Sequence, residues 1–369
     1  MKKVLFLIHD LGQGGAEKVL INLVNNMNSL LFDITVIALF GGGVNEQFLN
    51  ESITYKTVFP RMIPGNSHIM KLLSPAILHS LCVKGKYDIE ISYLEGPSAR
   101  IISGSRNKMS KKVCWIHSNI HSMQEGAKAF RSTKECISCY KQFDKVVFVS
   151  GDLKTAFTDI FGNIANYDVI YNTNETAKII ELSQEACDEI INDEFFNIVA
   201  VGTLKSVKGF DRLLRVINRL VDERTKVRLY ILGMGPLEKE FRNYIKENKL
   251  QNNVILLGHQ QNPYKYVSKC DLYVCSSYSE GFSTAATEAL IVGTPVCTTD
   301  VSGMKEMLGT NNEYGYIVDN DEKALYEGIK KFIDSYEFYD NYKKQAKLRG
   351  EFFSTDNTVN SVEEMLNKL

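Results

Sequence analysis

The apolar positions of the first half of the chain form short runs that alternate with segments of helical spacing. An apolar run at residues 2–9 precedes a glycine-rich turn, and apolar side chains then recur at helical intervals over residues 16–27. This alternation is typical of a parallel sheet that is covered by helices on both faces. The further strands that it predicts in this half lie at residues 32–40, 87–94, 111–118, 144–150 and 167–172.

The same alternation starts again near residue 196. The strands predicted here lie at residues 196–204, 227–235, 253–259, 271–277, 294–300 and 314–319, and the helices between them at 208–221, 237–249, 262–270 and 283–293. We therefore predict an α/β protein with two Rossmann-like, doubly wound domains, residues 1–173 and 174–351. A capped amphipathic helix at residues 352–369 is expected to pack back on the first domain. Ligands of such sheets bind at the carboxyl ends of the strands.

Length and composition agree with two soluble domains. A chain of 369 residues exceeds one ordinary core, and 44% hydrophobic with 24% charged residues is typical of globular proteins. No apolar run approaches the roughly 20 residues that span a bilayer. The apolar start also lacks the small-residue cleavage site of a signal peptide. These features predict a cytoplasmic location.

The net charge of −1 hides an asymmetry between the two halves. Residues 1–170 hold 19 Lys and Arg against 14 Asp and Glu, and the remainder holds 24 against 30. The segment 65–87 in the basic half is amphipathic and ends in lysines. One interpretation is peripheral contact with an anionic membrane surface. A helix packed on its own domain explains the apolar stripe equally well, so both interpretations stay open.

Two cysteines stand at C-x-x-C spacing, Cys136 and Cys139. No second pair and no nearby histidine completes a metal site. Because the surrounding residues have helical spacing, we expect these thiols to pack as ordinary apolar side chains.

Residues 279–290, SEGFSTAATEAL, place two carboxylates around the predicted start of a helix. Unpaired N–H groups at a helix start form an anion site, and Gly281 lets the backbone approach a ligand closely. Glu280 lies just outside the helix. Glu288 lies inside it and needs a hydrogen-bonding partner, which a ribose diol would supply. The alternative is a capped helix with a paired or solvent-facing glutamate. The amides expected at the anion site are those of Phe282, Ser283 and Thr284.

Residues 278–307 resemble the E-x7-E signature of the retaining nucleotide-sugar glycosyltransferases called family 4. These enzymes have the GT-B architecture, in which two Rossmann-like domains face each other across a cleft. The resemblance covers nearly all of the second half and scattered points of the first. Its other elements are a G-R-L…K-G-like segment at 201–214, a G-x-G-P turn at 231–240, the stretch 253–277, a G-G-A-E loop at 12–23 and a hinge at 170–175.

The resemblance implies a role for each matched residue. Glu288 would hold the ribose hydroxyls, and Glu280 would hold the donor sugar near its reacting carbon. Lys208 would neutralise the diphosphate, whose negative charge grows as it leaves. Gly14 and Gly15 would bring the backbone of the first domain against the same phosphates.

Further positions follow from the same resemblance. The loop at Leu257, Gly258 and His259 would bracket the nucleotide base. His117 falls where the family places a histidine that lines the junction of donor and acceptor; the alternative is a hydrogen-bonded histidine at a strand end. Thr203 stands where the family usually has an arginine, so phosphate binding would depend more on Lys208 and on backbone amides.

Metal binding has two weak signals in the sequence. A pair of His117 and His121 would require a helix between them and lacks an evident third ligand. The D-x-D spacing of Asp319 and Asp321 follows a strand and precedes a helix, so capping accounts for it. The family resemblance implies no required metal, and we expect neither a metal nor a cofactor.

The function that the resemblance implies is retaining transfer of a hexose or N-acetylhexosamine from a nucleotide sugar. We expect UDP as the nucleotide and a glycan or lipid-linked oligosaccharide as the acceptor, as in capsule, O-antigen or protein-glycan synthesis. Three alternatives stay open: a sugar-nucleotide epimerase of the same fold, an NAD-dependent oxidoreductase and a two-lobed binding protein. Against the oxidoreductase, Glu17 occupies the position of the third glycine of a dinucleotide fingerprint.

Overall fold

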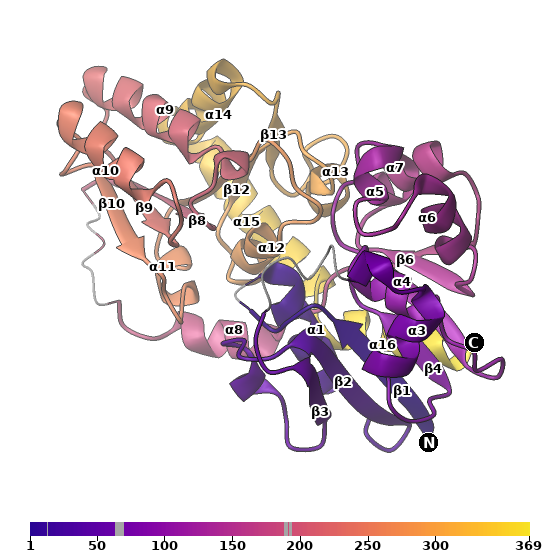
Figure 1. Cartoon of the computed structure of the whole chain (residues 1–369). Coiled ribbons are helices and arrows are strands. Elements are labelled where there is room, and N and C mark those ends of the chain that lie inside the picture. Colours follow the sequence, from indigo (N-terminus) through magenta and orange to yellow (C-terminus); the bar gives the residue numbers. More distant parts are fainter. Residues whose placement is uncertain (13, 63–69, 188–190, 192–193) are drawn as a thin grey trace. The chain divides into compact units, whose positions relative to one another are not determined.

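The computed structural model describes the chain except for residues 13, 63–69, 188–190 and 192–193 (Figure 1). It has two compact units, residues 1–174 with 355–369 and residues 175–354. The sequence put the join at 173–174 and a returning helix at 352–369. Part of the predicted amphipathic segment 65–87 lies outside the described residues, as do residues 188–190 and 192–193 near the start of the second predicted domain. None of the helices that the structure describes is long and apolar enough to cross a membrane.

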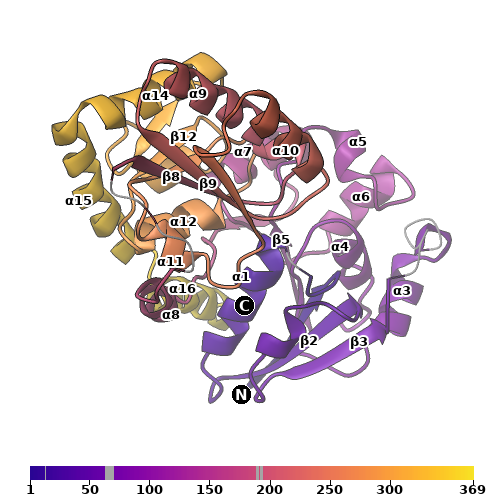
Figure 2. The same cartoon turned by 90° about the vertical axis from the view of Figure 1, so that its left-hand side faces the viewer.

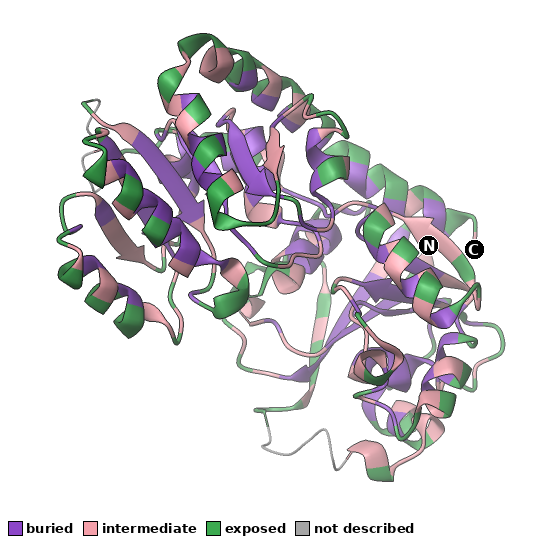
Figure 3. Ribbon diagram, turned by 90° about the horizontal axis from the view of Figure 1, so that it is seen from above, coloured by how far each residue is buried: buried purple, intermediate pink, exposed green. Residues whose placement is uncertain are grey.

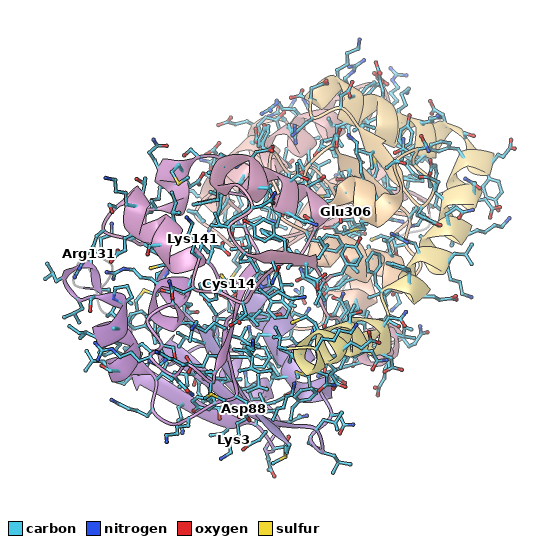
Figure 4. All side chains as sticks on the ribbon, turned by 90° about the vertical axis from the view of Figure 1, so that its right-hand side faces the viewer. Lys3, Asp88, Cys114, Arg131, Lys141 and Glu306 are labelled. Carbon is cyan, nitrogen blue, oxygen red and sulfur yellow. The ribbon has the colours of Figure 1, made fainter. Side chains whose placement is uncertain are left out.

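The first unit is built on a parallel sheet, which has seven strands in the described part of the chain, in the order β3-β2-β1-β4-β5-β6-β7. The backbone N–H of Lys3 donates to the Asp88 carboxylate at 2.8 Å, which ties the starts of neighbouring strands together (Figure 4). The strands are β1 (Lys2–Ile8), β2 (Phe32–Phe40), β3 (Thr54–Phe59), β4 (Ile89–Ser92), β5 (Lys111–Ile116), β6 (Lys145–Phe148) and β7 (Asn166–Val169).

Helices flank this sheet, and the last helix of the chain belongs to the same unit. The backbone N–H of Asn28 donates to Glu363 at 2.6 Å, and the Lys2 ammonium donates to the Leu366 carbonyl at 2.8 Å. The helical elements are α1 (Gly15–Asn26), η1 (Glu46–Phe48), α3 (Pro75–Cys82), α4 (Pro97–Ile102), α5 (Met123–Gly126), α6 (Thr133–Tyr140), α7 (Gly151–Phe161) and α16 (Thr355–Asn367).

The second unit is a parallel sheet of six described strands in the order β10-β9-β8-β11-β12-β13. Its strands β8, β9 and β12 are labelled in Figure 2. Its strands are β8 (Phe196–Val201), β9 (Val227–Leu232), β10 (Val254–Gly258), β11 (Leu272–Cys275), β12 (Val296–Thr299) and β13 (Tyr316–Val318). Its helical elements are α8 (Thr176–Ser183), η2 (Ser206–Lys208), α9 (Phe210–Asp222), α10 (Glu238–Glu247), α11 (Tyr264–Val267), α12 (Thr284–Ile291), α13 (Met304–Leu308), α14 (Glu322–Asp334) and α15 (Tyr336–Phe352). Two parallel sheets with flanking helices confirm the predicted α/β class.

Most of the strands are buried because they carry uninterrupted apolar runs, and Figure 3 shows the buried residues by colour. The edge strands β3, β7 and β13 differ, since all of their residues are exposed or half-buried. Of these three, β3 is the one that the sequence did not predict. Its sequence, TYKTVF, has no continuous apolar run, and the sequence analysis therefore missed it.

Helix α9 shows why the local sequence folds as it does. Apolar side chains at Phe210, Leu213, Leu214, Ile217 and Leu220 follow the i, i+3, i+4, i+7 spacing and are all buried. The helix begins at Gly209, whose φ of 62° is left-handed. A Cβ there would collide with the Ser276 carbonyl oxygen, so only glycine fits. The start of α9 is thus pressed against the loop after β11.

Helix α12 packs along α15 through a second close backbone approach. A Cβ on Gly350 would collide with the Leu290 carbonyl oxygen and would lie 2.8 Å from the Ile291 Cα. The missing side chain therefore sets how closely the two helices pack.

Replacing Gly350 by alanine tests this packing. In an unobstructed helix the change would stabilise by about 0.5–1 kcal/mol, but here the methyl group meets backbone atoms. Because overpacking costs about 1–3 kcal/mol, we expect Gly350→Ala to lower the melting temperature. The control is Lys347→Ala at an exposed position of the same helix. A melting temperature equal to or above that of the wild type would contradict the packing argument.

Candidate active site

The second sheet reverses its strand order between β8 and β11. The chain runs outward from β8 to β10 on one side and from β11 to β13 on the other, so β8 and β11 are neighbours whose following loops diverge. Ligands of open α/β sheets bind beyond the carboxyl ends of the strands at such a switch point. The loop after β8 carries Lys208, and the loop after β11 carries Glu280.

These two loops bring opposite charges together. The Lys208 ammonium lies 2.6 Å from Glu280 Oε1, and the Ser277 hydroxyl donates to the same oxygen at 2.6 Å. No described residue forms a hydrogen bond with Glu280 Oε2. The lysine side chain is 28% exposed and that of the glutamate 11%, so solvent still reaches the lysine. The two residues that were predicted to hold a diphosphate and a sugar therefore lie side by side.

Helix α12 begins where the sequence predicted. The Ser283 hydroxyl accepts from the Ala286 amide at 3.3 Å and caps the helix. No described contact takes the amides of Ser283 and Thr284, two of the three that were assigned to phosphate. Gly281 is half-buried and directly precedes the buried Phe282.

Glu288 is buried, with 7% of its surface exposed, on the second turn of α12. The Tyr264 hydroxyl, from α11, donates to Glu288 Oε1 at 3.2 Å. A buried carboxylate needs such donors. Tyr264 therefore fixes one oxygen of the side chain that was predicted to hold ribose.

The other predicted residues of this unit follow neighbouring strands. Thr203 is exposed just after β8. The preceding residue, Gly202, lies against the aliphatic part of the Lys208 side chain. A Cβ on Gly202 would lie 3.6 Å from two carbons of that side chain. Gly258 ends β10 with a φ of 68°, and its carbonyl accepts from Gly233 at 2.7 Å. Leu257 accepts from the Gln260 side chain, which shapes the loop that carries His259.

A buried cation holds the loop that leads to Glu280. Arg212, on α9, is 2% exposed and donates to the carbonyls of Ser276 at 2.8 Å and Ser277 at 2.6 Å. Its guanidinium carbon lies 4.0 Å from the centre of the Tyr278 ring. Burial lowers the pKa of Arg212 from its ordinary value, but an arginine stays charged at any physiological pH. The charged guanidinium of Arg212 therefore holds the loop in place through two backbone carbonyls.

The first unit carries the remaining candidates. Gly14 caps α1 and Gly15 is its first residue. The Glu17 carboxylate folds back over this start, close enough that a Cβ on Gly14 would collide with it. Burial is the main cause of a raised pKa of Glu17. A carboxylate at a helix start is favoured by the unpaired amides there, and Glu17 places its carboxylate beside the glycines that were predicted to meet phosphate.

His117 follows β5, and its backbone N–H donates to Glu95 Oε2 at 3.0 Å. Its ring lies 4.9 Å from the Tyr93 ring. Its Nε2 is buried and has no hydrogen-bond partner among the described residues. The alternative predicted for this residue was a hydrogen-bonded histidine at a strand end; its backbone N–H makes such a bond, whereas Nε2 makes none among the described residues.

Each metal signal of the sequence has a structural explanation. Residues 117–121 are not helical, so the helix that a His117–His121 pair required does not form. The Asp321 side chain accepts from the Ala324 amide at 2.8 Å and caps α14. Cys136 and Cys139 are buried in α6. Among the residues that the structure describes, no group of three or more His, Cys, Asp or Glu is placed to hold a metal ion.

Three residues around the site were missed by sequence reasoning: Ser277, Tyr264 and Arg212. Ser277 and Tyr264 lie in polar or aromatic stretches where spacing gives no sign of their carboxylate partners. For Arg212 the sequence does hold a signal. It lies four residues before Val216 and therefore on the same face of α9 as this apolar residue. An arginine on a buried face is rarely without a partner.

Comparison with known proteins gives a family match over the second unit. Residues 185–349 match the family described as glycosyl transferases group 1. The chain is 28% identical, over 96% of both chains, to the N-acetylgalactosamine-N,N'-diacetylbacillosaminyl-diphospho-undecaprenol 4-alpha-N-acetylgalactosaminyltransferase of Campylobacter jejuni. It is 23% identical to an uncharacterized glycosyltransferase of Haemophilus influenzae, over 97% of this chain and 98% of that one.

Solved structures share the fold at lower identity. Anabaena HepE in complex with UDP and glucose aligns over 100% of both chains with a TM-score of 0.77 at 18% identity. A glycosyltransferase from Rickettsia africae aligns with a TM-score of 0.78 at 17% identity, over 100% of this chain and 98% of that one. These likenesses concern the fold and confirm the predicted GT-B class.

The burial of His117 predicts a pH dependence of stability. Burial lowers its pKa from 6.5 to about 3. Between these values the unfolded chain binds a proton that the folded unit excludes, so the stability that is present above pH 6.5 falls as the pH falls towards 3. We expect urea unfolding at pH 7 and pH 5 to show a smaller loss of stability for His117→Gln than for the wild type.

The exposed His121 gives the matched control. His121→Gln should keep the wild-type dependence on pH. An identical loss of stability in wild type and His117→Gln would contradict the burial of this ring.

Proposed function

We propose that the chain, whose residues 185–349 match the glycosyl transferases group 1 family and which resembles a glycosyltransferase over 96% of its length, is a glycosyltransferase that transfers a sugar from a nucleotide sugar to a glycan or lipid-linked acceptor. The donor that we propose is a UDP-linked hexose or N-acetylhexosamine, and the anomeric configuration is retained. The observation that carries this proposal is the meeting of Lys208 with Glu280 beside the start of α12.

The chemistry that this arrangement supports is assigned to named groups. The diphosphate lies against Lys208 and the amides of Ser283 and Thr284, which stabilise the charge that grows on the leaving group. Glu288 accepts from the ribose hydroxyls. Glu280 accepts from a hydroxyl of the donor sugar through Oε2. The reaction that we propose includes no metal.

The bond changes of the proposed reaction balance without a further reactant. The bond from the anomeric carbon to the phosphate oxygen breaks, and its electron pair leaves with UDP. The acceptor hydroxyl attacks the same face of the sugar and forms the new glycosidic bond. Its proton passes to an oxygen of the departing diphosphate. The roles of Gly14, Gly15 and His117, which belong to the other unit, stay predictions.

The names of the relatives support the choice of donor and acceptor classes. The Campylobacter jejuni relative is named for transfer of N-acetylgalactosamine to a diphospho-undecaprenol-linked saccharide. Two structural neighbours are complexes with UDP-glucose or with UDP and glucose. The experiment that tests the proposal is incubation with UDP-glucose, UDP-galactose, UDP-GlcNAc or UDP-GalNAc and a polyprenyl-diphosphate-linked N-acetylhexosamine. Release of UDP that requires this acceptor supports transfer; release of UDP without any acceptor, or no release with any donor, counts against it.

Glu280 and Lys208 should separate turnover from binding. We expect Glu280→Gln to lower turnover on the order of 10²-fold or more, because a group that acts on the reacting sugar is lost. Lys208→Ala should instead weaken UDP binding, measured by calorimetry. Glu240→Gln, exposed on α10, is the control. Near-normal turnover by a folded Glu280→Gln enzyme would overturn the assigned role.

Peripheral contact with an anionic membrane is a further part of the proposal, and the charge of the first unit supports it. No Asp or Glu occurs between Glu51 and Asp88, whereas this stretch holds four lysines and one arginine. Large apolar side chains are also exposed in its described part. Leu72 is 79% exposed, Met62 58% and Leu81 54%. Exposed apolar side chains among basic ones favour an anionic lipid surface.

Flotation with liposomes that contain anionic lipid tests this contact. We expect binding at low salt that falls at high salt, because screening weakens attraction between charges. Changing the exposed Lys84 and Lys86 to glutamate should abolish flotation. The same change at Lys239 and Lys246, exposed on α10, should not. Absence of wild-type binding at low salt would exclude the contact.

A further inference from the structure

Ser277 connects the residues that hold the active-site loop to the Glu280 carboxylate, because its backbone bonds to the former and its side chain to the latter. The residue is 2% exposed. Its carbonyl accepts from Arg212 Nη2 at 2.6 Å and from the Thr299 hydroxyl at 2.7 Å. Two donors from different elements therefore fix the backbone of Ser277.

Because the backbone of Ser277 is fixed, the hydrogen bond from its side chain also restricts the position of the Glu280 carboxylate. A hydroxyl has one hydrogen to donate, and that of Ser277 goes to Glu280 Oε1 at 2.6 Å. The Cys275 thiol lies 3.6 Å from the Ser277 oxygen and serves as a donor to it. The acceptor side of the hydroxyl is thus occupied, which favours the bond to Glu280.

Lys208 binds the same oxygen of Glu280, but under the proposed function it also binds the diphosphate of the donor. Under the proposed function the ammonium turns towards the diphosphate when the donor binds. Ser277 then becomes the remaining described contact of Glu280 Oε1, since the structure gives this oxygen only these two partners. The loop also stays anchored, because Arg212 holds backbone carbonyls and not the lysine.

We propose that Ser277 is a positioning residue that keeps the Glu280 carboxylate aimed at the donor sugar after Lys208 has engaged the diphosphate. This inference rests on the proposed function. It assigns to Ser277 an effect on turnover through Glu280, with little effect on the affinity for the nucleotide.

The experiment compares turnover with nucleotide binding in Ser277→Ala. Because a misplacement of about 1 Å in a reacting group can cost 10²-fold, we expect kcat to fall roughly 10- to 100-fold. The UDP dissociation constant should stay within about twofold, because a group that acts on the sugar makes no contact with bound UDP. Ser277→Thr, which keeps the hydroxyl, should recover more activity than Ser277→Ala. The melting temperature of each variant is measured alongside.

The neighbouring Ser279 provides the matched control, since no described hydrogen bond uses its hydroxyl. Ser279→Ala should keep the kcat and the UDP affinity of the wild type. Wild-type kcat in Ser277→Ala would overturn the inference. An equal loss of kcat and of UDP affinity would also overturn it, because it would show a general collapse of the loop.

Failure of the inference and failure of the proposed function give different results. If Glu280→Gln is inactive while Ser277→Ala keeps full kcat, the proposed function stands and only the role of Ser277 is lost. If Glu280→Gln is fully active, the role of Glu280 itself is wrong, and the inference about Ser277 falls with it.

Discussion

The ion pair of Lys208 and Glu280 depends on the order of the strands in the second sheet. The two residues are 72 positions apart in the sequence, and their side chains meet at 2.6 Å because β8 and β11 are neighbours. Each residue lies in the loop that follows its strand, so parallel pairing brings both loops to the same edge. A slip of one residue in the pairing of β8 with β11 would turn the side chains of one strand to the opposite face. The site therefore depends on the register in which the strands of this sheet pair.

Arg212 shows how the fold keeps this edge rigid. Burying a guanidinium is costly unless acceptors replace its water. Here the acceptors are the carbonyls of Ser276 and Ser277 and the Thr299 hydroxyl, with the Tyr278 ring stacked on the cation. All of these except Thr299 belong to the loop before Glu280. Moving that loop would leave the buried charge of Arg212 with the Thr299 hydroxyl but without the two carbonyls and the ring. The free-energy cost of losing these partners therefore restrains the position of the loop.

The sequence predicted those parts of the molecule that a local pattern controls. The apolar runs located the buried strands of both sheets, and the residues around Ser283 located the start of α12. The edge strand β3 was missed because its side chains are mostly exposed, so no apolar run marks it. Ser277 and Tyr264 were missed for a different reason. Each contacts its glutamate through one hydroxyl, and the geometry of such a contact comes from tertiary packing that no spacing of residues records.

The absence of the family arginine at Thr203 can be understood from the same contacts. In the structure Lys208 already forms an ion pair with Glu280. The electrostatic attraction between this lysine and an incoming diphosphate would therefore be weaker than that of an unpaired lysine. Under the proposed function, donor binding would exchange one anionic partner of the lysine for another, which would lower the net gain from electrostatics. The amides at the start of α12 carry no such competing partner in the described structure. Under the proposed function, phosphate recognition would therefore depend more on the backbone amides at the start of α12 than on cations, and the placement of that helix start would matter correspondingly more.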